Sequence, residues 1–303
     1  MSILVTGALG AVGAPLVDEL RKRGHDVWLA DKPHSSDSKY LRCDIGEYRQ
    51  VERLFDGRKF DVVYNLAGEF GRNNGEDFYE TMWRTNAVGT KHFLRLQEKL
   101  RFKMVFTSSS EIYGDFNGVM KEDVPMKTPI RQLNDYAISK RVNEMQILNS
   151  AERFGTETVR LRLFNTYGPG EYYSDYRSVV CLFIYRALHR IPYTVFTKHH
   201  STFSWMFDTA RTMANIVDNF KPGEVCNISG DEYVAVKKAS DMILEQLGMD
   251  DSTVKYVDIE HHNTVDKRSD NLKAKRDLAH KETVKLKAGI ARTIEWQEKV
   301  YGK

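Results

Sequence analysis

Short β-like runs alternate with longer helical patterns through the first half of the chain, and this alternation limits the possible folds more than any other feature. The β-like runs cover residues 3–6, 26–30, 39–45, 61–67, 103–109 and 158–164. Helical patterns fall between most of them, at about residues 11–23, 47–56, 76–99 and 133–154. Alternation of this kind predicts an α/β fold in which a parallel sheet carries helices on both faces.

Distinctive clusters of small and polar residues follow directly after these runs. The clusters begin at Gly7, Asp31, Asp44, Ala67 and Ser108. In a doubly wound parallel sheet, ligands bind beyond the carboxyl ends of the strands, where the strand order reverses. We therefore expect a binding cleft at that edge of the sheet.

The sequence TGALGAVG, residues 6–13, joins the first run to the first helical pattern. Gly7 and Gly10 allow a turn with positive φ and let the backbone approach a ligand closely. Gly13 would let the following helix pack tightly on the strand. The free N–H groups and the positive end of that helix suit a pyrophosphate. Because the turn stands inside the alternating pattern, it predicts a dinucleotide site rather than an empty turn.

Asp31 ends the second run, roughly 20 residues beyond the glycine turn. A carboxylate at this position accepts hydrogen bonds from an adenosine ribose and repels a 2′-phosphate. The position therefore predicts NAD rather than NADP as the cofactor, although Lys32 and His34 could weaken the repulsion.

Composition excludes several classes of protein. The 45 basic and 42 acidic residues leave a net charge of +3, which is too small to indicate a nucleic-acid partner. No apolar run is long enough to cross a membrane, and Gly7 and Gly10 interrupt the N-terminal apolar stretch too early for a signal peptide. The 3 cysteines are widely spaced, so we expect neither a disulfide framework nor a zinc site, and a cytoplasmic location fits best.

The chain follows a less regular pattern after about Asn165. The stretch NTYGPGEYYSDY, residues 165–176, is rich in turn residues and should form a loop. Later helices are expected at about residues 179–189, 209–219, 236–247 and 283–299. We therefore divide the 303 residues into a cofactor-binding domain at 1–164 and a mainly substrate-binding lobe at 165–303.

The sequence YAISK places Tyr136 and Lys140 four residues apart in a helical pattern, hence on one face. An ordinary tyrosine is a poor base, because its pKa lies near about 10. A nearby ammonium and the positive nicotinamide ring of NAD⁺ would favour its phenolate. Ser109, in TSSSEIYGD, ends a strand, where its hydroxyl could hydrogen-bond a sugar oxygen. With the glycine turn, these residues indicate hydride transfer from a sugar alcohol.

At these residues the chain resembles the extended short-chain dehydrogenase/reductase family, in particular its nucleotide-sugar epimerases, dehydratases and decarboxylases. The resemblance covers nearly the whole length and is strongest from Met1 to Pro169. It implies a Rossmann-type doubly wound parallel sheet with a smaller C-terminal substrate lobe. It also implies a homodimer formed through the helices at about 76–99 and 133–154, where FYETMW and MQILN offer large apolar groups.

Positions that match the family's motifs imply a full set of site residues. The catalytic residues would be Ser109, Glu111, Tyr136 and Lys140. The substrate, a nucleotide sugar, would contact Ser109, Ser110, Asn165, Arg177 and His200. The cofactor NAD would be bound by Gly7, Gly10, Ala11, Val12, Gly13, Asp31, Asp44, Ile45, Leu66, Ala67, Gly68, Asn86, Thr107, Tyr136, Lys140 and Phe164.

The implied reaction is a temporary oxidation at C4 that gives a 4-keto sugar, with the cofactor regenerated in each turnover. The intermediate is then rotated, dehydrated or decarboxylated before hydride returns. We expect a 4-epimerase first, with a 4,6-dehydratase or a decarboxylase as the alternative. A simple NAD-dependent alcohol dehydrogenase or ketone reductase and a non-catalytic NAD-binding regulatory protein are further readings.

Glu111 bears on this choice without deciding it. Dehydratases of the family carry an acidic residue just before the matching glutamate, where this chain has Ser110. Decarboxylases use an arginine at the position that Ser201 occupies in HHSTFSWMFD. Some epimerases also carry the glutamate, and a purely structural carboxylate is a further reading.

The missing arginine also bears on the substrate, because family members commonly hold the nucleotide diphosphate with arginines at the Ser201 position and near IEHHNTVDK. This chain offers His199, His200, His261 and His262 instead. They could be solvated loop residues, or they could hold a phosphate together with Arg177. Paired histidines without a carboxylate pattern do not predict a metal site. The nucleotide and the sugar therefore stay open.

Overall fold

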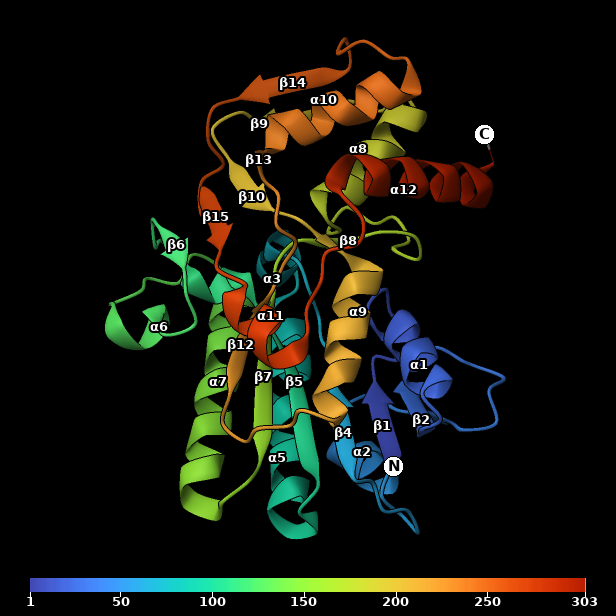
Figure 1. Ribbon diagram of the computed structural model, residues 1–303, viewed down its shortest axis with the longest axis vertical. Helices are drawn as coiled ribbons and strands as arrows, with labels where there is room; N and C mark the ends of the chain where they lie inside the picture. Colours follow the sequence, from blue (N-terminus) through green and yellow to red (C-terminus); the bar gives the residue numbers. More distant parts are fainter. Residues whose placement is uncertain (303) are drawn as a thin grey trace.

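A seven-stranded parallel sheet forms one part of the molecule in the computed structural model, which describes residues 1–302 (Figure 1). The strand order is β3–β2–β1–β4–β5–β7–β12, so the order reverses between β1 and β4. The strands are β1 (Ser2–Thr6), β2 (Asp26–Asp31), β3 (Tyr40–Arg42), β4 (Val62–Asn65), β5 (Lys103–Ser109), β7 (Thr158–Leu163) and β12 (Val225–Ile228). The predicted doubly wound parallel sheet is confirmed.

Alternate residues of each strand face opposite helical layers, as the two-residue period of a strand requires. Ile3 and Val5 of β1 belong to the core on one face, whereas Leu4 belongs to the core on the other. The first face is covered by α1 (Gly13–Lys22), α9 (Met206–Ala214) and α11 (Leu272–Leu278). The second face is covered by α2 (Tyr48–Arg53), α5 (Gly89–Leu100) and α7 (Asp135–Phe154).

The sheet takes one strand and two covering helices from the second half of the chain. Strand β12 pairs in parallel with β7, and α9 packs against α1. The division of the chain at residues 164 and 165 stays a prediction about function. In space, the second half both completes the sheet and forms the part above it.

The helix predicted over 76–99 is interrupted, and this prediction is corrected here. The structure has α3 (Arg72–Asp77), α4 (Tyr79–Trp83) and a π-helical turn at Arg84–Val88 before α5. Phe78 separates the first two helices because its backbone is not helical, with φ −134° and ψ 51°. The Tyr176 ring lies edge-on to Phe78, and its hydroxyl donates a hydrogen bond to Asp77 Oδ2 at 2.9 Å. Because these contacts join residues that are distant in the sequence, the helical periodicity does not predict the break.

The upper part of the molecule is built on three helices, α8 (Val179–Leu188), α10 (Val236–Leu247) and α12 (Leu286–Tyr301), which share one apolar core. All three were expected from the sequence, but the short strands beside them were not. A four-stranded sheet of order β13–β10–β15–β6 contains Tyr233–Ala235, His200–Thr202, Asp266–Ser269 and Val119–Met120. Two-stranded pairs join β14 (Val254–Val257) to β9 (Tyr193–Phe196) and β11 (Ser204–Trp205) to β8 (Thr166–Tyr167).

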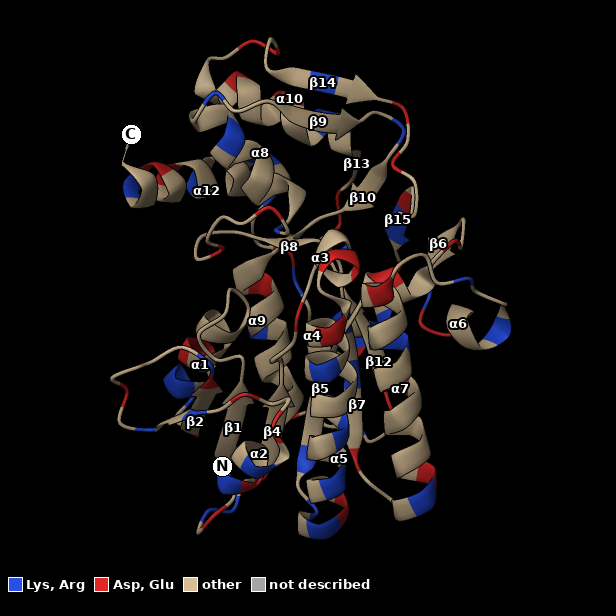
Figure 2. Cartoon of the chain, turned by 180° about the vertical axis from the view of Figure 1, so that it is seen from behind, with Lys and Arg blue, Asp and Glu red and all other residues tan. Residues whose placement is uncertain are grey.

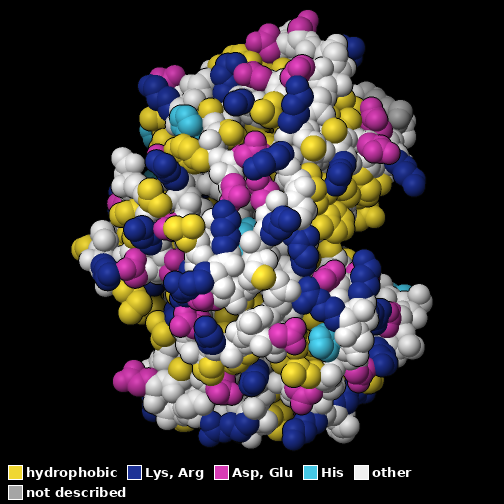
Figure 3. Space-filling model, in the orientation of Figure 1, with side chains coloured by type: hydrophobic (Ala, Val, Ile, Leu, Met, Phe, Trp, Pro, Cys, Tyr) yellow, Lys and Arg dark blue, Asp and Glu magenta, His cyan; other side chains and the backbone are white. Residues whose placement is uncertain are grey.

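The remaining elements are short. They are α6 (Val124–Lys127) and the 3₁₀ turns Ser110–Tyr113 and Asn215–Val217. No helix within residues 1–302 has the length and apolar character needed to span a bilayer. Basic and acidic residues, blue and red in Figure 2, are both present on the helices seen from behind. Figure 3 shows charges of both signs scattered over the opposite face, which is hollowed between the two parts and carries hydrophobic side chains on the upper rim.

Candidate active site

A cavity of about 650 Å³ lies at the carboxyl ends of the sheet strands, beneath the upper part of the molecule. It stands at the reversal of strand order between β1 and β4, where doubly wound sheets bind ligands. All but two of the predicted site residues line it. They are Gly7, Gly10, Ala11, Val12, Gly13, Asp31, Asp44, Ile45, Leu66, Ala67, Gly68, Thr107, Ser109, Ser110, Glu111, Tyr136, Lys140, Asn165, Arg177 and His200.

Two glycines of the first turn are required by the space around them. Gly7 has φ +66°, and a Cβ there would lie 2.8 Å from the backbone nitrogen of Ala67. A Cβ on Gly13 would lie 2.0 Å from the carbonyl oxygen of Gly7, so α1 packs on the turn only without a side chain. The turn therefore brings the start of α1 against the strand ends, and this geometry fits the pyrophosphate of a dinucleotide.

Two carboxylates line the same side of the cavity. Asp31 Oδ2 accepts a hydrogen bond from the backbone N–H of Leu9 at 2.9 Å, which ties the end of β2 to the glycine turn. Asp44 Oδ1 accepts from the N–H of Gly46 at 2.9 Å. Each carboxylate keeps lone pairs that can accept hydrogen bonds from ribose hydroxyls or an adenine amine. The residues present thus fit an adenine dinucleotide.

Asn86 and Phe164 are the two predicted cofactor residues that do not line the cavity. Asn86 lies in the π-helical turn, and its side chain accepts from the N–H of Glu69 at 2.8 Å and donates to the Glu69 carbonyl at 3.0 Å. It therefore fixes the loop after β4, which does line the cavity. Phe164 is fully buried beside Tyr113. Direct contact of either residue with the cofactor stays a prediction.

The helix α7 is held rigidly against the sheet. Asn134 caps its N-terminus by accepting from the N–H of Ala137 at 2.8 Å. Farther along, the buried Glu144 carboxylate accepts from Arg162 of β7 at 2.8 Å and from the Ser108 hydroxyl of β5 at 2.6 Å. Because a buried ion pair with further hydrogen bonds fixes geometry closely, the residues on the first turns of α7 have defined positions.

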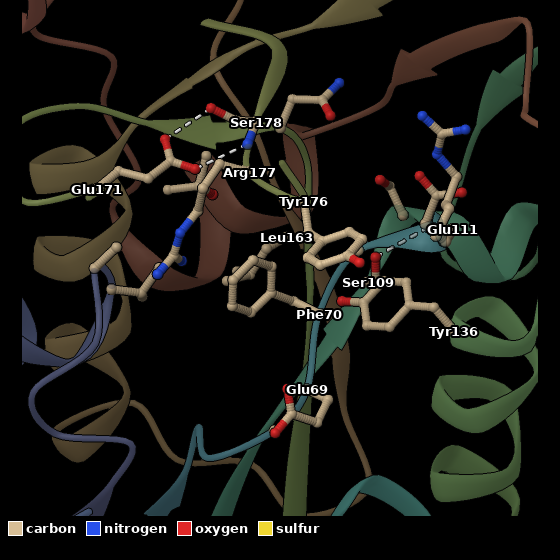
Figure 4. A pocket seen from close by; sticks show the side chains of 18 of the residues that line it. Glu69, Phe70, Ser109, Glu111, Tyr136, Leu163, Glu171, Tyr176, Arg177 and Ser178 are labelled. Atoms are coloured by element: carbon tan, nitrogen blue, oxygen red, sulfur yellow. Dashed lines mark hydrogen bonds between the residues drawn. The ribbon is translucent and has the colours of Figure 1, made fainter. Parts of the chain in front are cut away.

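These first turns carry Tyr136 and Lys140 to the cavity, opposite Ser109 at the end of β5 (Figure 4). Lys140 Nζ donates to the Thr107 carbonyl at 2.9 Å and lies 5.9 Å from the centre of the Tyr136 ring. Burial lowers the pKa of Lys140 to about 8. Ser109 Oγ accepts from the N–H of Glu111 at 3.2 Å, which orients its hydroxyl.

The protein's own groups favour the neutral form of Tyr136. Burial, opposed by the hydrogen bond to Ser109 and assisted by the Glu111 charge, raises the pKa of Tyr136 to about 12. Lys140 by itself therefore does not lower the pKa of Tyr136 below its ordinary value, and the sequence expectation combined this ammonium with the nicotinamide ring. A bound cation, such as an oxidised nicotinamide ring, is needed to complete the activation.

Glu111 forms a buried ion pair that sequence reasoning missed. Its Oε1 accepts a hydrogen bond from Lys267 Nζ of β15, while Oε2 has no hydrogen-bond partner within residues 1–302. Burial raises the pKa of Glu111, but the Lys267 and Arg72 cations together hold it below its usual value. Lys267 stands directly beside Ser201 in the parallel β10–β15 pair. Only this register reveals that a cation lies next to the position of the missing arginine.

The other predicted substrate residues, Asn165, Arg177 and His200, also line the cavity. The Arg177 guanidinium lies 4.2 Å from the centre of the Phe70 ring, and its Nε donates to the Tyr172 carbonyl at 2.9 Å. Asn165 hydrogen-bonds Ser201, and the His200 ring stacks on Tyr233.

The histidines are not gathered into a metal centre. His199 Nε2 accepts from the N–H of Glu260 at 3.0 Å, and burial lowers the pKa of this imidazole. His262 lies in a positive-φ turn, with φ 57°. Among residues 1–302, no three His, Cys, Asp or Glu side chains come together as metal ligands would.

Known proteins match this arrangement. Residues 3–229 match the NAD dependent epimerase/dehydratase family. The chain belongs to this family. A UDP-N-acetyl-alpha-D-glucosaminuronate decarboxylase of Bacillus cytotoxicus is 27% identical to this family member, over 97% of the chain and 96% of that protein.

Two solved structures share the fold along nearly the whole length of this chain. A UDP-glucose 4-epimerase of Thermotoga maritima with UDP-glucose has a TM-score of 0.89 and 25% identity, with 99% of this chain and 100% of that one covered. MoeE5 in complex with UDP-glucuronic acid and NAD has a TM-score of 0.87 and 26% identity, with the same coverage. The family member described here is thus an NAD-dependent enzyme of nucleotide-sugar chemistry.

Proposed function

We propose that this enzyme is a nucleotide-sugar 4-epimerase. The observation that carries the proposal is the ion pair that Glu111 forms with Lys267. Tyr136, Lys140 and Ser109 supply the groups for oxidation at C4, but the carboxylate beyond them is held by Lys267. A site of this kind supports proton and hydride exchange at one carbon and offers little for a second reaction at C5.

The proposal gives each residue a role that its position supports. NAD, when bound, supplies a hydride acceptor that is regenerated in each turnover. Tyr136 takes the proton of the C4 hydroxyl as the C4–H bond gives up its hydride, which leaves a 4-keto sugar. Ser109 donates a hydrogen bond to the C4 oxygen, and Lys140 favours the tyrosinate. After the 4-keto sugar has rotated within the site, Tyr136 returns the proton as hydride returns to the other face of C4.

Elimination of water is less well supported. A 4,6-dehydration removes the C5 proton and protonates the departing C6 hydroxyl, which requires a base and an acid. Ser110 lines the cavity where a second carboxyl group would be needed, and it cannot donate a proton as a carboxylic acid does. Glu111 is kept ionised by Lys267 and Arg72, so it is a poor acid.

Decarboxylation is also less well supported. Ser201 replaces the arginine that we associate with this outcome, and its hydroxyl is engaged by Asn165. Lys267 lies beside Ser201, but its ammonium is bound to Glu111.

The test is product analysis by NMR with UDP-, dTDP-, GDP- and CDP-sugars and catalytic NAD. We expect the 4-epimer of one sugar, with no net formation of NADH. A 4-keto-6-deoxy product would establish a dehydratase, and release of CO₂ a decarboxylase. Stoichiometric NADH with an oxidised product would establish a simple dehydrogenase.

A further inference from the structure

Two pairs of opposite charge lie together beyond Tyr136 at one end of the cavity. Lys267 is paired with Glu111, and both side chains are more than nine-tenths buried. Arg72, at the start of α3, is paired with Glu260 at 3.0 Å. All four residues line the cavity. Lys267 and Arg72 are therefore each already neutralised by a carboxylate of the protein.

The groups are close enough to act on one another and on the catalytic tyrosine. The charges of Lys267 and Arg72 both lower the pKa of Glu111, although burial opposes them. The Glu111 charge in turn raises the pKa of Tyr136. His199 also faces this cluster, but burial lowers its pKa, so it adds no charge near neutral pH. This end of the cavity therefore lies beside Tyr136, and its two ion pairs carry no net charge.

The opposite end is different (Figure 4). Arg177 lines it and forms no ion pair with another described residue. Its guanidinium is the group there that can meet the diphosphate of a nucleotide sugar. The cavity thus offers an unpaired cation at one end and balanced charge at the other.

We propose that this enzyme acts on nucleotide sugars whose glycosyl unit carries no carboxyl group, such as hexoses, and discriminates against uronic acids. The inference rests on the proposed 4-epimerase function and names its substrate class. A C5 carboxylate placed among these groups would find both Lys267 and Arg72 already bound to protein carboxylates. A neutral hydroxymethyl group needs no counter-charge, whereas burying a carboxylate without a free cation is costly, and this difference is a means of selection.

The test is titration calorimetry of the NAD-loaded Tyr136→Phe protein, in which turnover cannot disturb binding. UDP-glucose is compared with UDP-glucuronate, and dTDP-glucose with dTDP-glucuronate. For whichever nucleotide binds, we expect the neutral sugar to bind at least about tenfold more tightly than the uronate, because burying a carboxylate without a free cation costs more than that. Glu111→Gln should then shift this ratio toward the uronate by about tenfold, since it frees the Lys267 ammonium.

Two further variants isolate the charge pair. Adding Lys267→Met to Glu111→Gln removes the freed ammonium, so the gain for the uronate should disappear. Glu245→Gln is the matched control, because Glu245 is exposed on α10 and pairs only with Lys287, away from the cavity. It should leave the ratio unchanged.

Equal or tighter binding of the uronate by the parent site would overturn the inference and leave the 4-epimerase standing. An unchanged ratio in a folded Glu111→Gln protein would overturn it as well. If Glu111→Gln does not fold, the ratio in the parent site decides. Failure of every nucleotide sugar to bind would instead overturn the proposed function, and this inference with it.

Discussion

At the scale of single residues, we propose that the chemistry depends on Tyr136. Tyr136→Phe keeps the ring and removes the ionisable oxygen, so hydride transfer should slow by roughly 10²–10⁴-fold while NAD stays bound. The measurement is the rate of enzyme-bound NADH formation after mixing with the substrate. Tyr256→Phe, on the exposed strand β14, is the control. NADH formation at the parent rate in Tyr136→Phe would refute the mechanism.

The charge of Glu111 should appear in the pH dependence of the same step. Hydride transfer speeds up as Tyr136 loses its proton, and the Glu111 charge raises the pKa of Tyr136. Glu111→Gln removes that charge, so the rise in rate should move to lower pH. A single-turnover pH profile measures the shift. We expect turnover to survive in this variant. Accumulation of a 4-keto sugar with NADH would instead assign Glu111 to proton transfer in a dehydratase.

Asp31 is the residue that should select the cofactor. Asp31→Ala removes a charged hydrogen-bond acceptor, so affinity for NAD should fall roughly tenfold to a hundredfold, and the preference against NADP should relax. Because Asp31 also accepts from the Leu9 N–H, Asp31→Asn is the matched control that keeps an acceptor without the charge. Fluorescence titration with both cofactors measures the effect. Tighter NADP than NAD in the parent protein would exclude this role.

At the scale of elements, the packing of α1 on the glycine turn is the most demanding contact. A Cβ at position 13 would lie 2.0 Å from the Gly7 carbonyl, against 3.2 Å for a Cβ at position 10. Gly13→Ala should lower the free energy of unfolding by roughly 1–3 kcal/mol or more and abolish NAD binding, whereas Gly10→Ala should be milder. Thermal unfolding and NAD titration measure both. Ala is the better helix former, so unchanged or higher stability in Gly13→Ala would show that packing is not limiting.

At the scale of the whole molecule, we expect a homodimer. Helices α4, α5 and α7 lie side by side on one face (Figure 2). Met145 and Leu148, three residues apart on α7, are exposed, as are Phe78 and Tyr79 at the start of α4. Two-fold symmetric dimers bury apolar surface of this kind.

Substitution of that face should separate the subunits. Met145→Glu with Leu148→Glu should convert the dimer to a monomer, because the introduced charges would meet their symmetry mates. Met126→Glu, on α6, is the control, since Met126 is 75% exposed outside these helices. Light scattering after size exclusion gives the mass. A monomeric parent protein at micromolar concentration would contradict the expectation.

Local sequence determined the sheet and the cofactor side of the cavity. Strand ends in a parallel sheet meet at one edge, so the residues after each β-like run could be brought together without knowing any tertiary contact. Gly7, Asp31 and Asp44 lie where the pattern predicted, and Tyr136 and Lys140 share a face because four residues make about one helical turn. These inferences succeed because they depend only on chain period and strand direction.

Tertiary structure alone decided the sugar side of the cavity. Lys267 reaches Glu111 across 156 residues, from a strand of four residues whose pairing register no local period reveals. The break at Phe78 and the addition of β12 to the sheet have the same origin, since both are imposed by partners distant in sequence. The net charge at a site is the sum of the charges that such distant partners bring to it. For that reason the residue types of this chain predicted oxidation at C4, while the sugar class that we propose rests on which cations the fold has already neutralised.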